Sequence, residues 1–191
     1  MTAAKVISRR LAYDIGYGLS LSSIYIATDP KSYVANGVDS SAGLISRKEK
    51  RPKLAYFAFQ ALCTLFEGTS KAHDIGMNIQ PPSGTRINSV IPYNAVQSAA
   101  FRRNGIPMYS WFLPEREVIS AEVLMVEAIV MQRPEDSFTD PVVIDPLRQN
   151  IYRIENVEYP AWAKGLMVLQ LPTVDYPLFI TDLSLIKDCM G

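Results

Sequence analysis

The distribution of proline is the feature of this sequence that most constrains its fold. All but two of the 13 prolines follow position 80, where they separate short runs rich in β-branched and aromatic residues. Proline has no backbone N–H group and is excluded from helix interiors and central strands, so this spacing favours short strands joined by turns. The expected strands span residues 73–80, 96–103, 108–113, 121–131, 142–144, 151–157, 165–170 and 177–181.

Turn-forming residues stand between most of these strands. Asn104-Gly105 separates the runs FRR and IPMYSWF, and this dipeptide is favoured in two-residue hairpin turns. Eight short strands punctuated in this way are typical of a β-sandwich. We therefore expect residues 71–191 to form an antiparallel β-sandwich domain.

The first third of the chain has a different residue pattern, with two helical segments and little proline. Residues 3–18 predict an amphipathic helix, because apolar residues recur at four-residue spacing and Gly18 can close the helix in the left-handed conformation. Residues 19–28 are rich in β-forming residues and lead into Asp29-Pro30, so we expect a strand there. A polar loop follows, and residues 43–46 predict a brief extended return.

A second helix is expected between Pro52 and Gly68. Proline suits the first helical turn and glycine suits the position just past the end. Two apolar stripes run along this segment, one of Leu54, Ala58, Leu62 and Leu65 and the other of Phe59, Cys63 and Phe66. Because the apolar arc is so wide, we expect this helix to have neighbours on two sides.

Composition excludes several classes of protein. The chain has 191 residues, with 48% hydrophobic and 20% charged residues, and no apolar run approaches the ~20 residues needed to cross a bilayer. Lys+Arg and Asp+Glu balance at 19 each, so neither nucleic acid nor a membrane is an expected partner. TAAKVISRR lacks a secretory core, so the protein is cytoplasmic or the chain begins downstream of a removed signal.

Several motifs in residues 1–70 occur in a familiar order. They are Arg10-Leu11, Gly18, Tyr25 with Asp29, Gly43-Leu44-Ile45, and Pro52-Lys53-Leu54-Ala55-Tyr56. This order resembles the last part of the (β/α)8 barrel in retaining glycoside hydrolases, and it is most similar to the group containing β-xylosidases and α-L-iduronidase. The resemblance implies that residues 1–70 are a helix-strand-helix remnant of a barrel, with strand eight at 19–28 and helix eight beginning at Pro52.

The later two thirds resemble the β-sandwich that follows such barrels. The motifs are Tyr109-Ser110-Trp111-Phe112-Leu113-Pro114, Asp145-Pro146-Leu147, and Leu171-Pro172-Thr173-Val174-Asp175-Tyr176-Pro177-Leu178. The resemblance therefore spans nearly the whole chain. It implies an α+β fold by segments, with a barrel remnant over 1–70 and an accessory sandwich over 71–191.

The same resemblance implies that catalysis lies elsewhere. Retaining glycosidases need two carboxyl groups about 5–5.5 Å apart at barrel strand ends, and in the suspected family these come from strands four and seven. If residues 19–28 form strand eight, both strands precede Met1, so no residue is assigned as catalytic. We expect a C-terminal fragment of a glycoside hydrolase that is inactive alone.

Three residues are candidates for binding oligo- or polysaccharide. By the resemblance, Tyr25 offers a ring face to a sugar and Asp29 a hydrogen-bond acceptor; the alternative is that Tyr25 packs under the loop and Asp29 caps the turn. Trp162 lies in the loop-like PAWAKG and suits stacking on a sugar; the alternative is that it packs in the core or an interface. Trp111 is the other tryptophan, and we expect it in the core or an interface.

Other candidate sites have less support in the sequence. His73 is the sole histidine, which leaves no paired nucleophile or histidine-rich metal cluster, and no metal or cofactor is expected. Glu122 and Glu127 stand at odd spacing in one expected strand, so they face opposite sides and do not form a catalytic pair.

Two further hypotheses remain beside the hydrolase fragment. One is a non-catalytic carbohydrate-binding or structural interaction module built on the sandwich, and a weaker one is a complete but unfamiliar enzyme. A barrel remnant exposes strand edges and helix surfaces, so we expect docking with a missing N-terminal barrel portion or self-association as a homo-oligomer.

Overall fold

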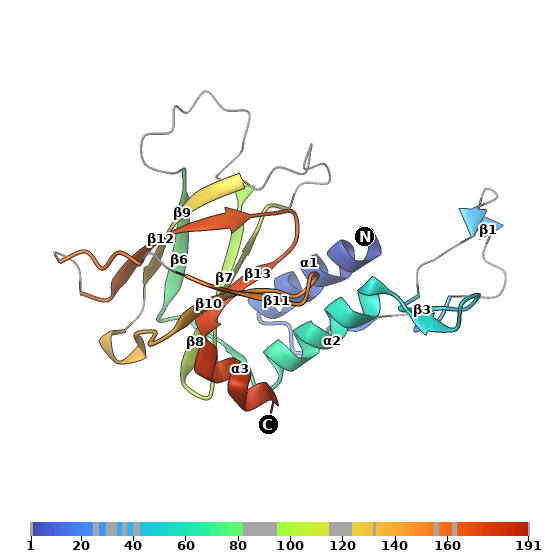
Figure 1. Ribbon diagram of the computed structural model, residues 1–191, viewed down its shortest axis with the longest axis horizontal. Helices are drawn as coiled ribbons and strands as arrows, with labels where there is room; N and C mark the ends of the chain where they lie inside the picture. Colours follow the sequence, from blue (N-terminus) through green and yellow to red (C-terminus); the bar gives the residue numbers. More distant parts are fainter. Residues whose placement is uncertain are drawn as a thin grey trace.

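The fold consists of three layers, with two helices on one side, a six-stranded sheet in the middle and a three-stranded sheet on the other side (Figure 1). The computed structural model describes residues 2–24, 27–29, 34–35, 38–39, 43–81, 95–114, 124–131, 133–154, 157–161 and 164–190. No helix in this part of the chain is long and apolar enough to span a membrane.

The middle layer is an antiparallel sheet with the strand order β11-β10-β13-β8-β7-β5. Its strands are β5 (Ser70–Lys71), β7 (Gln97–Arg103), β8 (Ile106–Phe112), β10 (Pro141–Asp145), β11 (Asn150–Arg153) and β13 (Leu178–Asp182). Strands β5 and β11 form the two edges, and β5 pairs with only part of β7.

The second sheet has the antiparallel order β12-β9-β6. Its strands are β6 (Gly76–Gln80), β9 (Leu124–Met131) and β12 (Leu166–Thr173). The two sheets face each other across one hydrophobic cluster, to which β9 contributes Val126, Ala128 and Val130. The expected sandwich is therefore present.

Side-chain alternation divides the interior into two cores. Along β8, Tyr109 and Trp111 point between the sheets, whereas Met108 and Phe112 point toward the helices. Strand β13 alternates in the same way, and all five of its residues are buried. The central strands β8 and β13 are thus covered on both faces.

The helix layer consists of α1 (Thr2–Gly16) and α2 (Leu54–Phe66), which pack on each other and on the six-stranded sheet. Leu11 of α1 and Leu62 of α2 share a cluster with Phe101 and Phe179 of the sheet. A third helix, α3 (Leu183–Met190), follows β13 directly and adds Leu185 to this cluster. The sequence did not predict α3.

Helix α2 has neighbours on two sides, as its wide apolar arc predicts. Ala58, Leu62 and Leu65 are buried, and Phe59 and Phe66 pack partly against the cores. The rest of the arc is open, since Leu54, Phe57 and Cys63 are exposed. The neighbours observed are α1 and the sandwich.

Short elements complete the chain. Two small ladders join β1 (Val34–Ala35) with β2 (Val38–Asp39), and β3 (Ile45–Ser46) with β4 (Arg51–Pro52). A 3₁₀ turn, η2 (Pro134–Asp136), lies between β9 and β10.

The proline-punctuated strands agree with the prediction, since each expected strand overlaps one observed between β6 and β13. The strand expected from residue 73 begins only at Gly76, and His73 lies exposed before it. At the β7–β8 turn both Asn104 and Gly105 have positive φ, at 52° and 81°, as the two-residue hairpin requires.

The strand expected over residues 19–28 is wrong for the part that the structure describes. Residues 19–24 are irregular, and Thr28 forms only an isolated parallel bridge with Ile45. A β-rich sequence becomes a strand only where a neighbouring strand offers backbone partners, and the described residues offer only Ile45, beside Thr28. The barrel remnant and the division at residue 70 remain predictions.

Candidate functional site

Asp29 anchors the loop that precedes α2. Its Oδ1 lies 2.5 Å from Nζ of Lys53 and accepts a 2.9 Å hydrogen bond from the backbone N–H of Gly43. A Cβ at Gly43 would lie 2.4 Å from the backbone nitrogen of Asp29, so only glycine fits this approach. Three motifs separated in sequence therefore meet at one point.

The electrostatics of Asp29 favour its charged form. Burial raises the pKa of its carboxyl, but hydrogen bonds from Lys53 and Gly43, together with the charge of Lys53, hold the pKa below its ordinary value. These contacts fit the turn-capping alternative, and a sugar contact for Asp29 remains a prediction. Tyr25 and Trp162, the other two candidates, lie outside the described residues.

Two aromatic residues of β8 lie in the core and present no ring at the surface. Trp111 and Tyr109 are fully buried. Nε1 of Trp111 donates a 2.9 Å hydrogen bond to the carbonyl of Pro172, and the hydroxyl of Tyr109 donates one of 2.9 Å to the carbonyl of Met131. The preferred expectation of a core tryptophan at position 111 is confirmed.

A groove of about 890 Å³ lies between the edge strands β11 and β12. The three-stranded sheet is narrower than the six-stranded one, so β12 leaves β11 uncovered on its inner side. The side chains that line it include Met125, Glu127, Tyr152, Arg153, Glu158 and Gln170. We call this hollow the β11–β12 groove.

A row of polar side chains crosses the outer face of the three-stranded sheet beside this groove. Gln80 and Gln170 are the two cross-strand neighbours of Glu127. Nε2 of Gln80 donates a hydrogen bond to Oε1 of Glu127, which is 9% exposed. Cross-strand register thus places amide, carboxylate and amide groups side by side.

One tyrosine ring, that of Tyr152, lines the opposite wall. Tyr152 of β11 is 44% exposed, and its hydroxyl accepts a 3.0 Å hydrogen bond from Nδ2 of Asn150. Glu158 pairs through its backbone with Val168, which holds the β11–β12 connection against β12. Tyr159 follows and is 55% exposed. Trp162 belongs to the same connection in sequence.

This arrangement suits a neutral ligand that carries many hydroxyl groups. Carboxylate and amide oxygens accept hydrogen bonds from hydroxyls, whereas amide and guanidinium N–H groups donate to them. Tyrosine, methionine and proline side chains supply apolar surface for the C–H faces of such a ligand. The groove lining thus offers both hydrogen-bonding groups and apolar surface.

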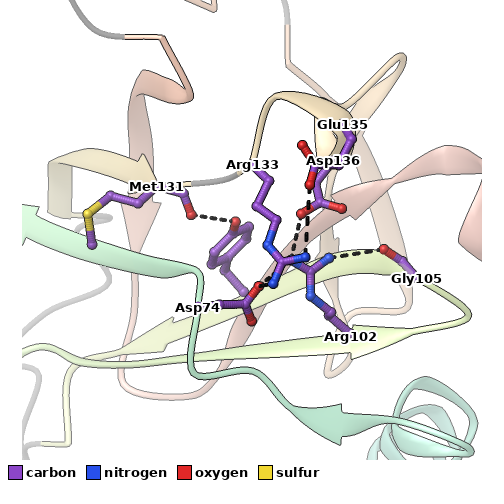
Figure 2. Close-up of polar contacts among 8 residues, drawn as sticks. Asp74, Arg102, Gly105, Met131, Arg133, Glu135 and Asp136 are labelled. Atoms are coloured by element: carbon purple, nitrogen blue, oxygen red, sulfur yellow. Dashed lines mark hydrogen bonds and ion pairs between the residues drawn. The ribbon is translucent and has the colours of Figure 1, made fainter.

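A second polar cluster joins three turns at the end of the sandwich (Figure 2). Nη2 of Arg102 lies 2.5 Å from a carboxylate oxygen of Asp136 and 3.0 Å from one of Asp74. Nη1 of the same arginine donates a 3.2 Å hydrogen bond to the carbonyl of Gly105. Arg133 also pairs with Asp74, at 2.6 Å. Both carboxylates are held by arginines, so the cluster cross-links the fold.

Hydrogen bonds in this cluster favour the charged forms of Asp74 and Arg102. The hydrogen bond from Arg102 is the main cause that lowers the pKa of Asp74, and the hydrogen bond to Asp136 raises the pKa of Arg102 further above its ordinary value. Neither group is placed to exchange a proton near neutral pH.

Sequence reasoning missed the groove residues Tyr152 and Gln170. The available signal was the alternation in LMVLQLPT, where Gln170 interrupts apolar residues and lies exposed in β12. Nothing local indicated that β11 would lie across from it, because that placement depends on β10 and β13.

Comparison with known proteins defines no family. No family model and no curated protein matches the chain. Among solved structures, one similar chain is the cycloisomaltooligosaccharide glucanotransferase of Paenibacillus sp., complexed with cycloisomaltoheptaose, with a TM-score of 0.44 and 11% sequence identity. The match covers 71% of this chain and 21% of that one, so this chain spans about a fifth of its length. The β-xylosidase/α-L-iduronidase resemblance remains a prediction.

Proposed function

We propose that this chain is a non-catalytic, carbohydrate-binding unit of a glycoside-active protein. The β11–β12 groove carries the proposal, because it combines hydrogen-bonding groups of both kinds with exposed tyrosine. Its volume of about 890 Å³ lies within the ~300–1,000 Å³ typical of ligand sites. The ligand class is a neutral oligosaccharide lying along β12.

Charge supports a neutral ligand. The groove holds two carboxylates, Glu127 and Glu158, and one guanidinium, that of Arg153, which also lies 3.8 Å from Asp140. An acidic sugar would meet like charge from both glutamates, whereas a neutral sugar would use them as hydrogen-bond acceptors.

In the proposed whole protein, retaining hydrolysis takes place in a (β/α)8 barrel whose strands four and seven supply the two carboxylates. The helix layer would then be the last part of that barrel, braced by the six-stranded sheet. The sequence motifs support this assignment, and the contact of Asp29 with Lys53 and Gly43 shows that three of them form one structural unit. The chain alone is expected to hydrolyse nothing.

Titration with xylo- and cello-oligosaccharides, followed by NMR shifts and calorimetry, tests the binding proposal. Binding should weaken about tenfold in Gln170→Ala and in Trp162→Ala, since each loses hydrogen bonds or stacking worth roughly 1–2 kcal/mol. Asn78→Ala is the matched control, because Asn78 is an exposed amide of β6 that does not line the groove.

The alternative location is a retained barrel subsite at Tyr25 and Asp29. Loss of binding in Tyr25→Ala with no change in Trp162→Ala and Gln170→Ala would favour that subsite. If none of these oligosaccharides binds, the carbohydrate proposal for the groove is overturned.

A further inference from the structure

Strand β11 presents an open edge of the six-stranded sheet. It pairs with β10 on one side, and no strand in the described part of the chain pairs with its other side. The backbone N–H of Ile154 donates to the carbonyl of Pro141. Because antiparallel residues alternate in direction, the backbone groups of Tyr152 also point to β10, whereas those of Ile151 and Arg153 point away from it.

The features that usually blunt an edge are sparse here. Native edges are protected by charge, proline, bulges, very short strands or a covering segment. Strand β5 is only two residues long, and β12 is covered where Glu158 pairs with Val168. Strand β11 instead has exposed apolar side chains on both faces, with Ile151 46% and Tyr152 44% exposed.

An apolar hollow continues the helix-side face of this edge. It has a volume of about 310 Å³ and lies between α2, the β10–β11 hairpin and α3. Its apolar lining includes Phe57, Ala61, Leu65, Ile144, Ile151 and Ile186. A strand added to β11 would therefore cover apolar surface as well as satisfy backbone groups.

We propose that a second copy of this chain pairs with β11 through its own β11, antiparallel and about a two-fold axis at Tyr152. This register uses extended residues only, whereas a register centred on Ile151 would bring in Gln149, whose φ is 55°. Ile151 of each copy exchanges two backbone hydrogen bonds with Arg153 of the other.

The side chains are compatible with this register. Each Arg153 lies opposite an isoleucine, so the two guanidinium groups are not cross-strand neighbours and like-charge repulsion is avoided. The two Tyr152 rings meet at the axis, in a pair without direct backbone hydrogen bonds, where side chains approach most closely. The inference rests on the open edge of β11 and not on carbohydrate binding, although Tyr152 also lines the β11–β12 groove.

Sedimentation equilibrium of the full chain tests the assembly. A dimer of twice the 21.3 kDa chain mass should form in a concentration-dependent manner. Ile151→Lys should weaken it at least about tenfold, because the new ammonium would face Arg153 of the second copy. Ile151→Pro should do the same by removing an outward N–H, a substitution that edge strands tolerate.

Leu21→Lys is the matched control. Leu21 is 81% exposed, lies after α1 and lines neither of the two hollows beside β11. Equal dimerisation of this variant and the unmodified chain is expected. Loss of the dimer in Leu21→Lys but not in Ile151→Lys would overturn the proposal and assign self-association to the helix-side surface.

Cysteine cross-linking tests the register. In a background with Cys63→Ser and Cys189→Ser, Tyr152→Cys should give a disulfide-linked dimer under mild oxidation, since directly opposed residues of this kind lie about 4.5 Å apart at Cα. Asn150→Cys points to the same face but should not cross-link, because its counterpart is displaced by about 13 Å along the strand. A monomer at all concentrations, or equal cross-linking of both variants, would refute the pairing.

Discussion

The hydroxyl of Tyr176 donates a 3.0 Å hydrogen bond to Oδ2 of Asp145, and both residues are buried. Oδ1 of Asp145 meanwhile accepts hydrogen bonds from the backbone N–H groups of Leu147 and Arg148, at 3.1 and 3.0 Å. One carboxylate thus closes the β10–β11 turn and ties it to the segment that leads into β13. Burial raises the pKa of Tyr176 well above its ordinary value, so the hydroxyl keeps its proton.

The residue before Tyr176 connects this segment with the helix layer. Asp175 pairs with Lys5 of α1 at 2.7 Å, and the Lys5 ammonium lies 5.7 Å from the centre of the Tyr176 ring. The Asp-Tyr pair therefore bonds in two directions, to a hairpin turn and to a helix. These contacts give a physical reason for Asp175-Tyr176 in the last motif of the sequence resemblance.

Replacement of Tyr176 by phenylalanine should destabilise the fold. Tyr176→Phe leaves buried Asp145 with one donor fewer, which we expect to lower the free energy of unfolding by about 1–2 kcal/mol. Urea denaturation followed by circular dichroism measures the change. Tyr159→Phe, at a 55% exposed position, is the control and should unfold like the unmodified protein; equal stability of both variants would contradict the role assigned to Tyr176.

The two arginines of Figure 2 should differ in importance. Arg102 is 19% exposed and bonds Asp136, Asp74 and a backbone carbonyl, whereas Arg133 is 52% exposed. Arg102→Met should cost about 2 kcal/mol of unfolding free energy through lost charge-assisted hydrogen bonds. Arg133→Met should have little effect, since exposed pairs are screened by solvent. A larger loss in Arg133→Met, by thermal or urea unfolding, would be inconsistent with this assignment.

Asp182 should make stability depend on acid pH. One of its oxygens accepts from the backbone N–H groups of Thr139 and Asp140, and the other from the N–H and hydroxyl of Ser184 in α3. Burial raises the pKa of Asp182, but these bonds outweigh it and the pKa is lowered. The stabilisation is therefore complete above the ordinary aspartate pKa of about 3.9 and is lost as pH falls through the lowered value.

Comparison with Asp182→Asn measures this contribution. At pH 7 the variant should be about 1–2 kcal/mol less stable, because the amide places a donor against backbone N–H groups. The gap should narrow as the pH falls below about 4, where Asp182 of the unfolded chain takes up its proton, and it should stop changing once the pH lies below the lowered pKa of the folded state. Urea unfolding across this range is the measurement, and a gap that does not change with pH would disprove the linkage.

Trp111 should be costly to replace even by another aromatic residue. Trp111→Phe removes the donor to Pro172 and leaves a small cavity between the sheets, so we expect a loss of about 2 kcal/mol. Calorimetric unfolding checks this value. A variant as stable as the unmodified protein would show that the hydrogen bond joining β8 to β12 contributes nothing.

The sandwich was predictable because its signals are local. Proline punctuation and the Asn104-Gly105 turn act within a few residues, and they gave the strands and one hairpin. The end of α1 was also predictable, since Gly18 adopts the left-handed conformation with φ of 80°.

Elements that depend on distant partners were not predictable. Residues 19–24 have β-forming composition, yet they lie outside any strand, because composition supplies no pairing partner. Helix α3 had a sequence signal in Asp182, whose carboxylate caps the start of the helix by accepting hydrogen bonds from the N–H and hydroxyl of Ser184. That signal was outweighed by the strand pattern of the residues before it.

The groove was not predictable from the sequence, because it requires β11 to extend past the narrower second sheet. A carbohydrate-binding surface was expected from the resemblance and from Trp162, and it stays a prediction. Asp29 illustrates the same limit, because its contacts with Gly43 and Lys53 join positions 14 and 24 residues away.

Strand β13 lies between β10 and β8, and all five of its side chains are buried. Its amide protons are shielded by a sheet on one face and by helices on the other, so solvent deuterium can reach them only when the entire molecule opens. The slowest isotope exchange in this protein should therefore be found at β13, where its rate reports the frequency of complete opening.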